Sequence, residues 1–289
     1  MNTKTTYQVA SRTSDLALIM TNEVVDRLKH IEPNSNWDIM GIKTISEGED
    51  KARFSTPLNE AVGSQRCRLA VHSAKDLPSV LENDIVICAI LKREDPSDAF
   101  ISHQYEHINQ LPENACIGTS SLRRTMLLKT LRPDLRVMKL RGNVDTRTKR
   151  AKDFDGIILA TSGLKRMQLQ HNISSYLDTA SFIPAPGQGA IALTCLKDDY
   201  EMIKLGASIT DPVTALCVNL ERALCAKINF SCHDPIGVYI EPENDQYRLH
   251  VMLTYDRQLF HRNVLLNEAS LPDYIERLAD DILNIKRIS

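Results

Sequence analysis

Two segments of the chain place hydroxyl side chains and arginine where an apolar run gives way to a helical pattern. One runs from Ala10 through Arg12 and Ser14, and the other runs from Gly118 to Arg124. A helix start offers free backbone N–H groups and the positive end of the helix dipole. With arginine added, such a turn suits a carboxylate or a phosphate. For either segment alone, the simpler interpretation is an N-cap followed by a solvated arginine. The presence of two such turns in one chain modestly favours anion binding over that interpretation.

A third segment adds Arg141 and Arg147 on either side of Gly142-Asn143, at the end of a predicted strand. Glycine and asparagine tolerate a left-handed backbone, so this loop can turn tightly. Together with Arg12, Arg123 and Arg124, the two arginines complete a candidate set of five cations. A ligand with several carboxylates would match this set, because the guanidinium fork binds carboxylate bidentately. The simpler interpretation is an exposed loop in which Asp145 pairs locally.

An acid–base cluster, Lys75-Asp76, follows the apolar run that contains His72. Strand ends in α/β domains are favoured ligand positions. We expect Asp76 to stay ionised beside so much positive charge, where it could stabilise a developing cation or move protons. A surface Lys-Asp pair in a turn before proline is about as consistent with the spacing. For His72, a packed strand residue is the favoured interpretation.

The chain has seven cysteines, and no CxxC or Cys/His metal spacing, so we predict no metal site. Most thiols are expected to act as small buried hydrophobic groups. Cys232 differs, because it lies in a polar loop between a predicted helix and a predicted strand, which makes it the best candidate for a reactive thiol. The competing interpretation is an incidental free cysteine. His233 is discounted as its base, since adjacent side chains on an extended segment point apart.

Length and composition indicate a soluble protein of two or three domains: 289 residues, 43% hydrophobic and 25% charged. The formal net charge of −2 provides no general basic field for nucleic acid, so anion binding must come from local arginines. The N-terminal residues lack a signal-peptide apolar run, and no apolar stretch approaches the roughly 20 residues that span a bilayer. We therefore expect a cytoplasmic protein without nucleic-acid or membrane partners.

The elements that position these residues follow from hydrophobic periodicity. Strands are predicted at 7–10, 37–43, 69–72, 85–91, 116–118, 136–140, 156–160 and 190–195, and helices at 16–28, 58–62 (after Thr56-Pro57 as N-cap and first helical residue) and 122–131. From residue 211 the pattern changes to a helix at 214–227, strands at 237–241, 247–254 and 259–266, and a helix at 272–288. This predicts an α/β fold of three domains: an α/β domain at 1–95 plus about 190–209, a second at 96–189 with a cleft between the two, and a small α+β domain at 210–289.

In combination, these motifs are specific. The chain resembles the porphobilinogen deaminases (hydroxymethylbilane synthases) in the ordered stretches SRTSDLAL, AVHSAKDLP, KREDPSDAF, IGTSSLRR, LRGNVDTR, IILATSGLKR, PAPGQGAI, ERAL and SCHDPIG, from about residue 8 to 240. The resemblance implies two lobes like those of periplasmic ligand-binding proteins and a third domain that carries the cofactor cysteine. It implies a monomer that takes part in porphyrin and haem biosynthesis.

The resemblance also implies residue roles. Cys232 matches the cysteine that holds a dipyrromethane cofactor by a thioether, Asp76 matches the catalytic aspartate, and Lys75 matches a cofactor-contacting lysine. The other implied contacts with the cofactor and growing chain are Arg12, Ser14, Thr119, Ser120, Ser121, Arg123, Arg124, Arg141, Arg147 and Gln188. The implied reaction is a transfer in which porphobilinogen loses ammonia and adds to the primer; four additions give a linear chain that water releases as hydroxymethylbilane.

Two departures from the family pattern keep an alternative open. The segment 44–58 lacks a block that the family usually has, which implies a short active-site loop. Phe230-Ser231 stands where Gly-Gly usually precedes the cofactor cysteine, which predicts a more restricted backbone. The alternatives are therefore a catalytically impaired relative that binds pyrroles or polycarboxylates, and a two-lobed anion-binding protein without a covalent cofactor.

Overall fold

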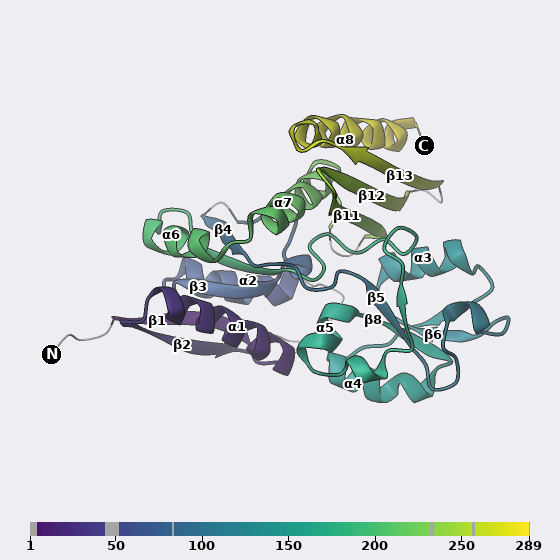
Figure 1. The fold of residues 1–289 in the computed structure, drawn as a ribbon, viewed down its shortest axis with the longest axis horizontal. Helices are drawn as coiled ribbons and strands as arrows, with labels where there is room; N and C mark the ends of the chain where they lie inside the picture. The colour runs from purple at the N-terminus through teal and green to yellow at the C-terminus, as the bar shows by residue number, and fades with distance from the viewer. Residues whose placement is uncertain (1–4, 44–51, 83, 232–233, 256–257, 289) are drawn as a thin grey trace. The chain divides into compact units, whose positions relative to one another are not determined.

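The computed structural model describes residues 5–43, 52–82, 84–231, 234–255 and 258–288. The chain forms two compact units. The colours of Figure 1 follow the chain from the N-terminus (purple) to the C-terminus (yellow). Unit 1 comprises Met1–Arg93 and Ala190–Leu216, and unit 2 comprises Glu94–Gly189 and Cys217–Ser289.

Unit 1 is built on a five-stranded sheet. Its strands are β1 (Thr5–Arg12), β2 (Ser35–Ile42), β3 (Leu69–Ser73), β4 (Ile85–Ile90) and β10 (Ile191–Leu196), in the order β2-β1-β3-β10-β4. β1 is parallel to β2 and β3, whereas β10 is antiparallel to β3 and β4. The chain therefore returns at β10 and inserts between two strands that it formed about a hundred residues earlier.

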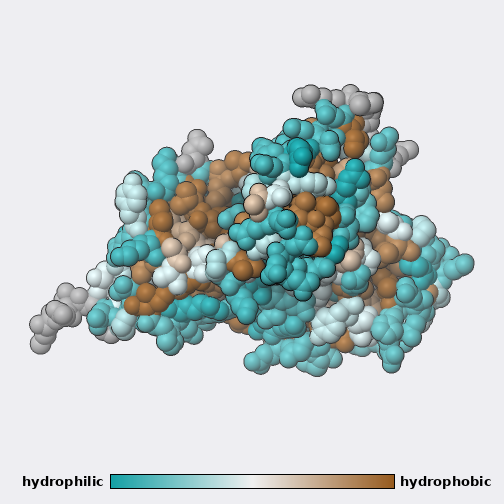
Figure 2. Space-filling model, turned by 45° about the horizontal axis from the view of Figure 1, so that its top comes forward, coloured by the Kyte–Doolittle hydropathy of each residue, from teal (hydrophilic) through white to brown (hydrophobic). Residues whose placement is uncertain are grey.

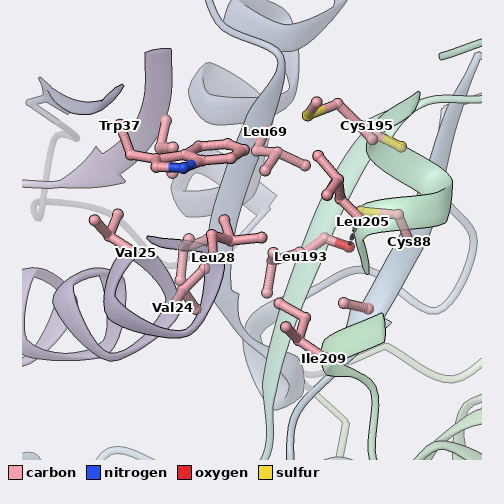
Figure 3. Close-up of a cluster of buried hydrophobic side chains, with 14 of the residues drawn as sticks. Val24, Val25, Leu28, Trp37, Leu69, Cys88, Leu193, Cys195, Leu205 and Ile209 are labelled. Atoms are coloured by element: carbon pink, nitrogen blue, oxygen red, sulfur yellow. Dashed lines mark hydrogen bonds between the residues drawn. The ribbon is translucent and has the colours of Figure 1, made fainter. Parts of the chain in front are cut away.

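Helices cover both faces of this sheet. Residues from α1 (Asp15–Ile31) and α6 (Tyr200–Ile209) form one hydrophobic cluster with Trp37, Leu69 and Leu193, as Figure 3 shows. Residues from α2 (Ala52–Gly63) form another cluster with Ala10 and Ala70. Leu69 and Ala70 thus face opposite sides, as the two-residue period of a strand requires.

The predicted start of α2 is wrong. Thr56-Pro57 resembles a cap followed by a first helical residue, yet α2 begins at Ala52 and Pro57 lies inside it. Proline at this position removes one intrahelical hydrogen bond. The local signal misled because packing decides the helix: Leu58, Ala61 and Val62 are buried against the sheet.

Unit 2 contains a second five-stranded sheet. Its strands are β5 (Asp98–Ile101), β6 (Cys116–Gly118), β7 (Arg136–Met138), β8 (Gly156–Ala160) and β9 (Ser175–Leu177), in the order β7-β6-β8-β5-β9. The helices of this sheet are α3 (Leu122–Leu131), α4 (Val144–Lys149) and α5 (Thr161–Arg166). β6 is parallel to β7 and β8, whereas β5 is antiparallel to β8 and β9.

The C-terminal part of unit 2 is a three-stranded antiparallel sheet with helices, as predicted. Its strands are β11 (Ile236–Glu243), β12 (Gln246–Tyr255) and β13 (Gln258–Leu266), flanked in sequence by α7 (Pro212–Lys227) and α8 (Leu271–Ile288). α8 buries Leu271, Ile275, Leu278 and Ile282, which share one face of a helix. The predicted fold class, two α/β lobes and a small α+β part, is confirmed.

Hydrophilic and hydrophobic residues are interspersed on the face that Figure 2 shows. The hydrophilic residues, drawn in teal, cover much of this face. None of the helices in the described part of the chain is both long enough and apolar enough to span a membrane.

Candidate functional site

In unit 1, backbone pairing carries three of the predicted residues to one edge of the sheet. β1 and β3 are parallel neighbours in which Ala10 is the partner of Ala70. β1 ends at Arg12, and β3 ends at Ser73, followed at once by a single 3₁₀ turn, Ala74–Asp76. The carboxyl ends of parallel strands meet at the same edge, so this edge carries Arg12, Lys75 and Asp76.

The turn that carries Lys75 and Asp76 is held by main-chain bonds at both ends. The Ala74 N–H donates to the Ala190 carbonyl at 3.0 Å, and the Leu77 N–H donates to the Ala74 carbonyl at 3.3 Å. Both Lys75 and Asp76 are half-buried. Burial lowers the pKa of Arg12, and the attraction of Asp76 opposes that shift. Arg12 and Asp76 therefore interact electrostatically, and arginine stays protonated even after such a shift.

Of the two N-cap candidates for α1, Ser14 and Asp15, the structure has Ser14 at the N-cap, but its hydroxyl makes no capping hydrogen bond. Its carbonyl instead accepts from the Leu18 N–H at 3.0 Å, and its side chain is half-buried. The turn is supported from behind, where the Thr21 hydroxyl donates to Ser11 Oγ at 2.7 Å. The Ser14 hydroxyl is thus not used in capping, which suits it to a ligand contact.

In unit 2, two predicted loops lie side by side after the parallel strands β6 and β7. The Thr119 N–H donates to the Met138 carbonyl at 2.9 Å, and Ser120 Oγ donates to the Leu140 carbonyl at 3.0 Å. The hydroxyl turn 119–121 therefore adjoins the loop that carries Arg141. Thr119 is buried, Ser121 is half-buried and Ser120 is exposed.

The loop after β7 turns tightly at Gly142, as predicted. Gly142 has a φ of +119°, and a Cβ there would lie 3.0 Å from Thr146 Cγ2. Arg141 is exposed, and Arg147 is half-buried on α4. Asp145 pairs locally with Lys149 at 2.9 Å, as the simpler interpretation of this loop expected. The contact of Arg141 and Arg147 with a ligand stays a prediction.

Arg123 and Arg124 are not solvated first-turn residues, so that interpretation is wrong. They are 5% and 6% exposed, and both contact Asp98. The pKa of Arg123 is lowered, because the effect of burial exceeds the opposing attraction of Asp98. Ser121 caps α3 through the Arg124 N–H at 3.4 Å, as predicted. The contact of these two arginines with a cofactor stays a prediction.

Gln188 is fully buried, and its amide donates to the carbonyls of Pro96 (2.7 Å) and Ser97 (3.3 Å) and to Asp98 Oδ1 (3.1 Å). These contacts tie it to Asp98, and its direct contact with a cofactor stays a prediction. Asp98 itself is not predicted as a site residue by the sequence. The stretch KREDPSDAF contains it, but nothing local marks it as the partner of two arginines on α3.

Cys232 and His233 lie outside the described residues. The residues on either side of them form a hydrogen-bonded pair: the Ser231 N–H and hydroxyl both donate to Asp234 Oδ2, at 2.6 and 2.9 Å. Phe230 is buried, and neither Phe230 nor Ser231 has a positive φ; Asn229 has one, at 54°. Phe230 and Ser231 therefore do not adopt the left-handed backbone that would favour glycine at these two positions.

The remaining thiols behave as the sequence predicts. Cys67, Cys88, Cys195, Cys217 and Cys225 are buried, and Cys116 is half-buried. Burial raises the pKa of Cys67 to about 11 and that of Cys225 to about 12, which keeps both thiols protonated and unreactive near neutral pH. His72 is a packed strand residue as expected, 5% exposed and 3.0 Å from Thr194 Oγ1.

The described residues contain no group of three or more His, Cys, Asp or Glu side chains that could hold a metal ion.

The protein has two α/β lobes whose sheet edges carry arginine and hydroxyl side chains, and a small third sheet. Residues 7–204 match the family described as "Porphobilinogen deaminase, dipyromethane cofactor binding domain".

Relatives named porphobilinogen deaminase cover most of the chain. One from a Roseiflexus species is 37% identical, with 97% of each chain covered. One from Brevibacillus brevis is 38% identical over 81% of this chain and 79% of the relative, and one from Legionella pneumophila is 39% identical over 80% and 79%. The chain belongs to the porphobilinogen deaminase family.

Among solved structures, the chain is similar to a nutrient binding protein from Burkholderia cenocepacia bound to methionine. The identity is 13% and the TM-score is 0.48, over 78% of this chain and 96% of that one. A methionine binding protein gives 11% identity and a TM-score of 0.47.

Proposed function

We propose that this chain is a transferase that deaminates porphobilinogen and joins four units into linear hydroxymethylbilane on a dipyrromethane primer at Cys232. The observation that supports this best is the sheet edge of unit 1, where Arg12 and the Lys75-Asp76 turn meet within the segment that matches the family. A carboxylate on a turn that main-chain bonds hold at both ends is suited to a reaction that develops positive charge on a pyrrole.

Asp76 is the proposed catalytic residue. Its carboxylate would stabilise a cationic pyrrole as ammonia leaves, and would accept the proton that the attacking ring carbon releases. Because Asp76 lies on a one-turn segment bonded at both ends, its position is fixed before substrate arrives. Lys75 and Arg12 would contact the cofactor at the same edge.

The residues present fit a dipyrromethane, whose acetate and propionate groups are anionic. The half-buried Arg12 and Ser14 in unit 1 and the exposed Ser120 and Arg141 in unit 2 are donors of the type that such groups require. When bound, the cofactor would supply the free α-carbon that attacks the incoming pyrrole. The protein would hold its carboxylates with Arg12, Ser14, Thr119, Ser120, Ser121, Arg123, Arg124, Arg141 and Arg147. Orientation of this kind can supply much of a rate gain.

The proposal includes a cytoplasmic monomer with porphobilinogen as its small-molecule partner, and no nucleic-acid or membrane partner. The net charge of −2 supports the part that concerns nucleic acid.

The test is to incubate the purified chain with porphobilinogen and to follow substrate loss, ammonia release and the linear product together. The proposal expects four ammonia molecules for each hydroxymethylbilane. A chain that binds porphobilinogen without releasing ammonia would instead be the impaired relative. A chain that neither binds nor consumes it would contradict the proposed function.

A further inference from the structure

Asp98 joins three side chains from distant parts of unit 2. It begins β5, is fully buried, and pairs in register with Ala160 of β8 and Leu177 of β9. Its Oδ2 accepts from Arg123 Nη2 at 2.7 Å. Its Oδ1 accepts from Arg124 Nη2 at 2.7 Å and Nε at 3.1 Å, and from the Gln188 amide at 3.1 Å. A single carboxylate therefore orients two neighbouring guanidinium groups.

Main-chain carbonyls fix the same two guanidinium groups in a second direction. Arg123 Nη1 donates to the Ile183 carbonyl at 2.7 Å, and Arg124 Nη1 donates to the Ile158 carbonyl at 2.9 Å. The Phe182 ring centroid lies 6.0 Å from Arg123 Cζ. Both arginines are thus held rigidly, in contrast to the exposed Arg141.

The charges of this trio do not balance. Two protonated guanidinium groups meet one carboxylate, which leaves an excess of one positive charge within Asp98, Arg123 and Arg124. Coulombic attraction is stronger at buried positions than in water. The excess charge therefore favours a further anionic group close to the start of α3.

The excess charge lies at the start of α3, because Arg123 and Arg124 are the second and third residues of that helix, directly after the hydroxyl turn. We propose that Asp98, supported by Gln188, is a positioning residue: it holds the two guanidinium groups so that the start of α3 attracts a carboxylate of the pyrrole cofactor. This inference rests on the proposed function. Asp98 is not assigned any contact with the cofactor itself.

Asp98→Asn tests the proposal, with Asp95→Asn as the matched control. Asp95 lies three residues earlier and binds Lys165 at 2.9 Å and the Ser97 hydroxyl at 2.6 Å. Full-length apoproteins, prepared from cells that cannot make porphobilinogen, are incubated with porphobilinogen, and the gain of dipyrromethane mass is followed by intact-mass spectrometry. Circular dichroism defines a temperature at which every variant is folded.

Asp98→Asn is expected to gain the cofactor mass at least about tenfold more slowly than wild type, because one partner of a buried charge cluster is lost. Asp95→Asn should match wild type, and Asp98→Glu should recover part of the rate. Gln188→Met, which removes one bond to Asp98, should slow the gain less strongly.

An Asp98→Asn protein that gains the mass as fast as Asp95→Asn would overturn the positioning role and leave the proposed function intact. A wild-type chain that gains no mass would overturn the proposed function, and this inference with it. If Asp98→Asn does not fold, Gln188→Met decides, because a wild-type rate in that variant would also overturn the role.

Discussion

Ala10 on β1 and Ala70 on β3 are register partners in a parallel pair, and both are fully buried. From this pair, two further residues along β1 reach Arg12, and six further residues along the other segment reach Asp76. The relative position of the guanidinium group and the proposed catalytic carboxylate is thus set by sheet pairing. Sites built on helices and strands of a scaffold are held more precisely than sites on loops, and Asp76 lies on a short 3₁₀ helix directly after β3.

Asp76→Asn is expected to keep the fold and to lower turnover of porphobilinogen by at least about a hundredfold, the usual scale of a lost acid–base group. The change removes a charge and one proton acceptor, while the main-chain bonds of the turn remain. Steady-state kinetics with circular dichroism checks this. Asp84→Asn, at an exposed carboxylate of the same unit that binds Lys197, is the control and should keep wild-type turnover. Near-normal turnover in Asp76→Asn would remove Asp76 from the mechanism.

Acid sensitivity of unit 1 should depend on Asp199. Burial acts to raise the pKa of Asp199, but bonds from Arg68 and the Met202 N–H outweigh it, so the folded pKa lies below the ordinary value. A lowered folded pKa gives stability that is present above the unfolded pKa of about 3.9 and is lost as pH falls through the folded pKa.

Asp199→Asn should therefore lower the urea midpoint by a constant amount above about pH 5, with the difference shrinking as the pH falls below about 4. Urea unfolding of the full chain at a series of pH values measures this. The control Asp198→Asn, at an exposed neighbouring carboxylate, should follow wild type throughout. A difference that stays constant to the lowest pH would contradict the assignment to Asp199 ionisation.

Gly206 on α6 packs against the backbone of β4 more closely than a side chain allows. A Cβ at Gly206 would lie 2.4 Å from the Cys88 carbonyl oxygen. Gly206→Ala should therefore destabilise the protein by about 1–3 kcal/mol or more, the usual cost of overpacking. Gly63→Ala is the matched control, because a Cβ there has no heavy atom within 4 Å; it should leave stability unchanged or raise it by about 1 kcal/mol. Equal thermal midpoints for the two variants would show that α6 can shift away.

Glu221 on α7 joins two segments of unit 2 through its carboxylate. One oxygen accepts from the Gly187 N–H at 2.7 Å, and the other accepts from the Ile240 N–H at 2.9 Å. Glu221→Gln turns one acceptor into a donor that faces an N–H group, which should cost about 1–3 kcal/mol in denaturant unfolding. Glu276→Gln, at an exposed carboxylate that pairs with Lys227, should cost much less. Equal losses in both variants would contradict a structural role for the buried carboxylate.

The elements that the sequence predicts best are those with a strong period of their own. α8 shows clear helical spacing, and the structure has it and the three C-terminal strands within a few residues of the predicted bounds. β5, with four residues, and β9, with three, were missed because each short run begins with a polar residue and adjoins polar stretches, which hide its apolar residues.

The site could be predicted in part for a similar reason. Arg12, Asp76 and the hydroxyl turn lie at strand ends, where local sequence and general rules for α/β sheets agree. The partners of Asp98 could not be predicted, because Arg123, Arg124 and Gln188 are 25, 26 and 90 residues away along the chain. Only tertiary packing brings such groups together. For the same reason, the simpler interpretation of Arg123 and Arg124 as solvated residues was wrong.

The most direct measurement is the intact mass of the purified wild-type chain beside Cys232→Ser, both made in cells with abundant porphobilinogen. The account predicts that wild type carries the added mass of one dipyrromethane and that Cys232→Ser has the mass of the bare polypeptide. A wild-type chain at the bare polypeptide mass, or the same added mass in both proteins, would contradict a thiol-anchored primer.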